Sequence, residues 1–282
     1  MKKIVALSLA AVLALSMGAV SFAEEFTTVA EGKLTIGTSP DFAPYEFYHT
    51  DENGTPQLAG FDIALAQRIA DDLGLELEVV PIDFGGILTE LQSGNIDLGI
   101  SGFSPTPERA ETFDFSDLYY TGGQAFCVSM ENKDAFESYD DFAGLSVGAQ
   151  TGSIQYGLAE ENTPDANIVG LTKVTDIVME LLNGTLDGAF IEKDVALQYA
   201  KNYPDLCVLW DVEFDSEGSA IALKKGNEGL LNAVNDVIAA ALEDGSMSQY
   251  IEEAQLLASD DPDKVFEGML DENGELPVED ET

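Results

Sequence analysis

The stretches LQSGNIDLGI at Leu91–Ile100 and LLNGTLDGAF at Leu181–Phe190 resemble each other. Each is typical of a helix that ends at a glycine and is followed by a short buried strand. Upstream of each stretch, an apolar segment runs into a polar loop, KLTIG at Lys33–Gly37 and LSVG at Leu145–Gly148. Because the same plan of strand, loop and helix occurs twice in the same order, the sequence predicts two similar α/β lobes.

Apolar patterning and turn residues predict the remaining elements. Asp62 is expected to cap a helix whose apolar face is spaced as a helix requires, and Gly74 to end it. A hairpin is expected around the turn at Asp51–Gly54. The predicted strands are 34–38, 76–80, 167–170, 186–191 and 218–223, and the predicted helices are 63–73, 86–92, 175–182, a short one from 154, and a last one at 228–242.

The domain boundaries follow from where the chain passes between lobes. Two crossings, near Cys127–Met130 and near Gly218–Leu223, predict a two-strand hinge. The first lobe is then residues 32–127 plus 221–258, and the second is residues 128–220. Residues 259–282 are rich in Asp and Glu, which predicts an acidic tail after the last helix.

The N-terminus has the pattern of a secretion signal. Met1–Lys3 is basic, Ile4–Met17 is apolar, and Ser21–Ala23 provides a small-residue cleavage site, so residues 1–23 are expected to be removed. No cysteine stands at the cleavage point to carry a lipid, which favours a free secreted protein, periplasmic or extracellular. Cys127 and Cys207 either pair in that oxidising compartment or remain two buried thiols.

Composition restricts the function classes. The 282 residues include 53 acidic and only 12 basic side chains, a net charge of −41, which excludes nucleic acid as a partner and disfavours an anionic membrane surface. The single histidine, His49, is expected at the surface beside the hairpin turn. The sequence shows no Cys–His pair, metal-ligand spacing or phosphate-binding loop, so we expect a binding protein with no metal or cofactor.

Two charged side chains stand out as candidates for a ligand that carries both charges. Arg109 follows a helix start at Thr106–Pro107 and is suited to a carboxylate, unless it merely pairs with Glu108 or Glu111 at the surface. Glu192 ends a buried strand, where α/β folds bind ligands, and is suited to an ammonium group. The alternative is that Glu192 has no binding role and is simply the first polar residue after a buried strand.

Three further features complete the candidate site. The strand-to-helix turn Gln150–Ser153 offers backbone N–H groups to an anion, although such turns also occur as ordinary capped helix starts. Phe42 and Phe84 follow strands and are suited to flank a ligand side chain, with core packing as the alternative.

Five motifs together resemble the polar amino-acid-binding proteins of ABC importers. The most specific match is GFSPTPER at Gly102–Arg109 followed by FDFSDLYY at Phe113–Tyr120. The others are APYEF at Ala43–Phe47, GFDIALA at Gly60–Ala66 and DFGGI at Asp83–Ile87. The resemblance extends from about residue 33 to about residue 242, nearly the whole mature chain.

The resemblance implies an α/β fold of the type II periplasmic-binding-protein class, with two lobes that close over a free amino acid. It implies that Arg109 clamps the ligand carboxylate, that Gly152 and Ser153 supply N–H groups from the other lobe, and that Gly102 and Ser104 meet the ammonium or carboxylate. Asp62 is expected to be structural. The complete expected site is Phe42, Phe84, Ser101, Gly102, Ser104, Arg109, Gln150, Gly152, Ser153 and Glu192.

Two departures from the family pattern concern the ligand. Ser39 stands where the family often has an Asp, which slightly favours a neutral polar amino acid, and Glu192 stands where Asp is usual. The expected partners are the ligand and the importer's membrane subunits, with the chain itself a monomer. The alternatives are an enzyme on the same scaffold, similar to cyclohexadienyl dehydratase, with Glu192 as its acid or base, and a sensor domain.

Overall fold

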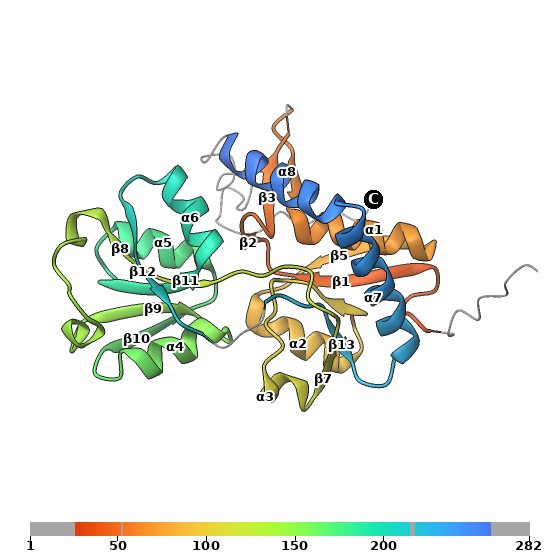
Figure 1. The fold of residues 1–282 in the computed structure, drawn as a ribbon, viewed down its shortest axis with the longest axis horizontal. Coiled ribbons are helices and arrows are strands. Elements are labelled where there is room, and N and C mark those ends of the chain that lie inside the picture. The colour runs from red at the N-terminus through yellow and green to blue at the C-terminus, as the bar shows by residue number, and fades with distance from the viewer. Residues whose placement is uncertain (1–25, 52, 215–217, 261–282) are drawn as a thin grey trace, which may run out of the picture.

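The computed structural model describes residues 26–51, 53–214 and 218–260. Within these residues the chain forms two α/β lobes that lie side by side (Figure 1). Each lobe has a five-stranded sheet with helices packed against it. The expected signal at 1–23 and residues 261–282 of the expected tail lie outside the described residues.

The first lobe is built on a sheet with strand order β5-β1-β6-β13-β7. Strand β1 pairs in parallel with β5 and β6, whereas β13 runs antiparallel to β6 and β7. The strands are β1 Lys33–Thr38, β5 Glu76–Pro81, β6 Leu98–Gly99, β7 Phe113–Phe115 and β13 Ala222–Lys224. The helices of this lobe are α1 Phe61–Leu73, α2 Phe84–Ser93, α3 Pro107–Ala110, α7 Glu228–Glu243 and α8 Ser246–Asp260.

The expected hairpin belongs to a separate small sheet on this lobe. Its strands are β2 Asp41–Phe42, β3 Glu46–Thr50 and β4 Pro56–Ala59, all paired antiparallel. His49 lies in β3 opposite Gln57 of β4 and is half-buried, so it is less open to solvent than expected.

The second lobe has the strand order β10-β9-β11-β8-β12. Strands β10, β9 and β11 are parallel, and β8 is antiparallel to both β11 and β12. The strands are β8 Gln124–Ser129, β9 Ser146–Gln150, β10 Asn167–Leu171, β11 Gly188–Glu192 and β12 Leu206–Val212. The helices are α4 Ile154–Asn162, α5 Val174–Leu182 and α6 Lys193–Asn202, with 3-10 turns at Met130–Asn132 and Tyr139–Phe142.

The first crossing between the lobes lies earlier than the sequence predicts. Because β8 pairs with β11 and β12, residues 124–127 belong to the second sheet and not to the first lobe. The two crossing segments bridge each other between Tyr120 and Ser219. A Cβ atom at Gly218 would stand 2.2 Å from the Tyr120 carbonyl oxygen, so this approach requires glycine.

The last predicted helix is also not the last one. After α7 the chain forms α8, whose Met247, Ala254 and Ala258 are buried. Helix α8 contacts α1 and α7 of its own lobe and α6 of the second lobe (Figure 1). Ser259, expected in the tail, therefore belongs to this helix.

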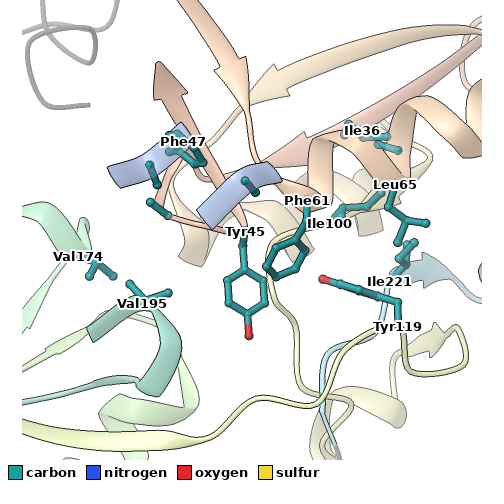
Figure 2. Packing of buried hydrophobic residues seen from close by; sticks show 14 of the residues in the cluster. Ile36, Tyr45, Phe47, Phe61, Leu65, Ile100, Tyr119, Val174, Val195 and Ile221 are labelled. Carbon is teal, nitrogen blue, oxygen red and sulfur yellow. The ribbon is translucent and has the colours of Figure 1, made fainter. Parts of the chain in front are cut away.

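One apolar cluster continues from the first lobe into the second. Figure 2 shows Tyr45 beside Phe61, with Val174 and Val195 of the second lobe facing them. The Tyr45 and Phe61 rings are 4.3 Å apart. Burial of apolar side chains from both lobes in one cluster favours the closed arrangement seen here.

The two cysteines are free. In the antiparallel pair β8–β12, Cys127 stands opposite Val208 and Cys207 stands opposite Val128, so the two thiols point to opposite faces of the sheet. They pack in different apolar clusters, which excludes a disulfide in this fold. No helix among the described residues is long and apolar enough to cross a membrane.

Candidate functional site

A pocket of about 600 Å³, counting space open to solvent, lies between the two lobes beside the crossing segments. Eight of the ten expected site residues line it, from the ends of β2, β9 and β11, the start of α2 and the loops around α3. They are Phe42, Phe84, Ser101, Gly102, Ser104, Arg109, Gln150 and Glu192. The other two, Gly152 and Ser153, line a neighbouring cavity that shares Arg109 with the first.

Arg109 is held in place by a short helix and two carbonyl groups. Thr106 caps α3 by accepting the Arg109 backbone N–H at 3.3 Å, and Pro107 occupies the first helical position. The guanidinium donates to the Ser104 carbonyl at 3.0 Å and, across the cleft, to the Gly152 carbonyl at 3.1 Å. Burial lowers the pKa of Arg109 to about 10, so the group stays charged at neutral pH.

Two aromatic rings support this guanidinium. Phe84 and Phe103 stack with centroids 4.7 Å apart, and the guanidinium carbon lies 5.7 Å from the first ring and 5.3 Å from the second. Phe84 therefore both lines the pocket and holds Arg109 by cation–π contact. Phe42 lies 5.1 Å from Tyr45, so these two rings form another side of the pocket.

Glu192 ends β11 and caps the following helix α6. Its Oε2 accepts the Val195 N–H at 2.9 Å, and its Oε1 accepts the Gly123 N–H at 3.3 Å. The side chain is buried, and this desolvation, with Asp194 nearby, raises the pKa of Glu192 to about 8. Burial, and to a smaller extent the nearby Glu192, raises the pKa of Tyr45, whose hydroxyl therefore remains protonated.

The loop Ser101–Gly102 rests on two buried carboxyl groups of the first lobe. Ser101 donates to Glu46, and the Gly102 N–H donates to Asp62 at 3.0 Å. Tyr119 also donates to Asp62 at 3.0 Å. The expectation that Asp62 caps its own helix is wrong, because the helix begins at Phe61, two residues earlier than predicted, and leaves Asp62 in the first turn, where it accepts the Gly102 N–H.

The turn Gln150–Ser153 meets the first lobe directly but uses part of its backbone internally. The N–H groups of Thr151 and Ser153 donate to the carbonyls of Leu171 and Gln150. These two groups are therefore not free for an anion, contrary to the expectation for Ser153. At Gly152 a Cβ atom would stand 3.1 Å from Cα of Gly85, which shows how closely the lobes approach.

The sequence did not single out ten other pocket residues. Most come from the crossing segments and the start of α4, which carry no recognisable motif. They are Tyr45, Gly122, Gly123, Gln124, Ile154, Gln155, Val212, Phe214, Gly218 and Ser219. The motif around Pro44 contains Tyr45, so a signal was present for that one residue.

The pocket presents a guanidinium and a carboxyl group that do not pair with each other. Within residues 26–51, 53–214 and 218–260, Arg109 forms no ion pair with a carboxylate and Glu192 none with a basic side chain. Burying either charge without a partner is unfavourable. The described part of the chain also offers no cluster of three metal-ligating side chains. A ligand that carries both a carboxylate and an ammonium group matches this pocket.

Comparison with known proteins gives close relatives over nearly the full chain. The chain is 34% identical to the arginine-binding extracellular protein ArtP of Bacillus subtilis, over 88% of this chain and 96% of that protein. It superimposes with a TM-score of 0.78 on the amino acid ABC transporter substrate-binding protein AbpA of Streptococcus pneumoniae, solved with L-arginine bound, at 37% identity over 81% of this chain and 97% of that one.

A third relative is an ancestral amino acid-binding protein, AncCDT-1, described as a precursor of cyclohexadienyl dehydratase. It has a TM-score of 0.70 and 35% identity, over 79% of this chain and 95% of the other. The family model of bacterial extracellular solute-binding proteins, family 3, matches residues 34–254. With its two α/β lobes and the charged pocket between them, the chain belongs to the family 3 bacterial extracellular solute-binding proteins.

Proposed function

We propose that the protein captures a free amino acid between its lobes for an ABC importer, with Arg109 on the ligand carboxylate and Glu192 on its ammonium group. The observation that carries this proposal is one pocket that holds a buried guanidinium and a buried carboxyl group, neither of which forms an ion pair with another described side chain. A zwitterion offers a partner to each group, and its ammonium favours the ionised form of Glu192, so closure over it offsets the cost of burying both charges.

We further propose L-arginine as the ligand. ArtP is named as an arginine-binding protein, and AbpA was solved with L-arginine bound. The net charge of −41 attracts a cation, and Arg109 is the only basic residue among those that line the described pocket. A neutral polar amino acid is the second candidate, because Ser39 stands where the family often has an acid; in this structure, however, the Ser39 hydroxyl donates to Asp41 and Ser39 does not line the pocket.

A ligand panel separates these candidates. L-arginine at a concentration far above its Kd should raise the unfolding midpoint by several degrees, because a ligand that binds only the folded state stabilises it. Lysine, glutamine, histidine and cystine should give smaller shifts at the same concentration. A larger shift with glutamine than with arginine would contradict the arginine proposal, and no shift with any free amino acid would contradict the binding role.

Gly122 provides a geometric test of the ammonium side of the pocket. A Cβ atom at this position would stand 2.4 Å from Glu192 Oε1 and 2.9 Å from the Tyr45 hydroxyl. Gly122→Ala should therefore displace both groups and weaken amino acid binding at least about tenfold by calorimetry, as expected for a pocket geometry disturbed by a misplaced group.

The neighbouring Gly123 is the matched control. Its added Cβ atom would meet only the flexible side chain of Lys193, at 3.3 Å, which can move aside. Gly123→Ala should leave the affinity within about threefold of the wild type. Equal losses in the two variants would show that backbone freedom, and not the space beside Glu192, matters here.

The remaining parts of the proposal concern context. We propose that residues 1–23 are a cleaved secretion signal and that the chain acts as a monomer outside the cytoplasm, in keeping with its extracellular family. We also propose that it is not an enzyme. Glu192 is the only carboxyl group among the described residues that line the pocket, and it already accepts the Val195 and Gly123 N–H groups.

A further inference from the structure

Helix α5 of the second lobe begins without a cap of its own. Its N-cap position is Lys173, a residue whose side chain has no acceptor, and no side chain within the helix segment caps it. A helix start leaves N–H groups that need acceptors. The first of these, the Val174 N–H, finds its acceptor on the other lobe, in the carboxylate of Asp41.

Asp41 is fixed on the first lobe by its neighbours. It lies in β2, and its Oδ1 accepts the Ser39 hydroxyl at 2.7 Å. Its backbone carbonyl accepts the Tyr199 hydroxyl of α6 at 3.1 Å, a second hydrogen bond between the lobes at the same residue. The side chain is buried in this closed arrangement. Burial raises the pKa of Asp41 to about 6, so it is a carboxylate at pH 7.5.

Both ends of this contact connect to the ligand pocket. On the first lobe, the Ser39 N–H donates to the Ser101 hydroxyl at 3.2 Å, and Ser101 lines the pocket. On the second lobe, Gln150 lines the pocket and donates to the Thr172 carbonyl, two residues before α5, at 3.1 Å. The residues that meet the ligand thus lie one or two hydrogen bonds from the Asp41 contact on each side.

We propose that Asp41 caps α5 only when the lobes close, so that this side chain positions the second lobe over the bound amino acid and slows its release. This inference rests on the proposed function. Asp41 does not line the pocket and makes no contact with the ligand in this account. Its effect is therefore expected in the dissociation rate and not in the chemistry of recognition.

The test uses the full mature chain with L-arginine at pH 7.5, or with the panel amino acid that most raises the wild-type midpoint. Asp41→Ala should raise the dissociation rate, measured by stopped flow, about fivefold or more, as for loss of a helix cap. The unfolding midpoint of the ligand-free protein should stay within about 2 °C of the wild type, because that form opens and leaves both groups in water. Asp41→Asn keeps a capping oxygen, so its dissociation rate should stay within about threefold of the wild-type rate.

Asp117 supplies a control for charge. It lies exposed on the first lobe, and Asp117→Ala removes the same charge and should leave the dissociation rate unchanged. An unchanged dissociation rate in Asp41→Ala would overturn the proposal, as would an equal drop in the ligand-free and ligand-bound midpoints or a failure of this variant to fold. The last two results would show that the contact is also present in the ligand-free protein. Absence of binding by the wild type would instead contradict the proposed function.

Discussion

Replacing Arg109 by alanine should weaken amino acid binding by about a hundredfold to a thousandfold. In the proposed complex the closed pocket buries the ligand carboxylate, and removal of the Arg109 guanidinium leaves that charge unpaired, at a cost of about 3–4 kcal/mol. Isothermal calorimetry with L-arginine measures the loss directly. The affinity of Arg109→Lys should lie between those of the wild type and Arg109→Ala. The lysine ammonium keeps the charge, but it cannot donate two parallel hydrogen bonds or stack on Phe84 and Phe103 in the same way.

Arg68 is the matched control for this prediction. It lies on α1 and pairs with Asp72 and Asp244 at the surface, away from the pocket. Arg68→Ala should leave the affinity unchanged, since exposed ion pairs contribute little and none of its partners lines the pocket. An Arg109→Ala variant that binds as tightly as Arg68→Ala would contradict a role for the Arg109 guanidinium in ligand binding.

The second large effect concerns Glu192, whose replacement should strongly weaken binding while stabilising the ligand-free protein at alkaline pH. Glu192→Gln keeps the size of the side chain and removes the charge that faces the ligand ammonium. We expect a loss of affinity of about a hundredfold or more by calorimetry. Glu160→Gln, an exposed position on α4, is the control and should bind normally.

The stability half of this prediction follows from the pKa of Glu192. Because the folded-state pKa, about 8, lies above the ordinary value of 4.5, the contribution of this group to stability is fully present below pH 4.5 and is lost as the pH rises through 8. The shift corresponds to at most about 5 kcal/mol, and opening of the ligand-free lobes lets water reach the group and reduces this figure.

Without ligand, Glu192→Gln should therefore unfold several degrees higher than the wild type at pH 8.5, and at nearly the same temperature at pH 4.5. Thermal unfolding at the two pH values measures the difference. An equal midpoint at pH 8.5 would contradict a desolvated Glu192, and an unchanged affinity would contradict its role with the ammonium. Such a gain in stability with a loss of binding is characteristic of a buried charge retained for function.

The repeated sequence plan predicted the two lobes because each repeat contains its own local signals. The glycine that ends each helix, the apolar strand after it and the polar loop are all features of neighbouring residues. The same locality explains why Arg109, Glu192 and Phe42 could be predicted, since each follows directly from a strand end or helix start. The comparisons and the structure confirm the fold class.

The features that the sequence did not predict depend on residues far apart in the chain. The sequence predicts residues 124–127 in the first lobe, but β8 pairs with β11 and β12 and places them in the second. Asp62 resembles a helix cap locally, yet its acceptor role is set by Gly102, 40 residues away. Asp41 caps a helix 133 residues later in the chain. No local pattern marks such contacts, because tertiary packing creates them.

A crystal structure of the mature protein with its amino acid bound tests the account most directly. We expect the ligand carboxylate oxygens within about 3.2 Å of the Arg109 guanidinium nitrogens, and the ligand ammonium within the same distance of Glu192. A ligand that occupies the pocket with its carboxylate away from Arg109, or with its ammonium held by groups other than Glu192, would contradict the account.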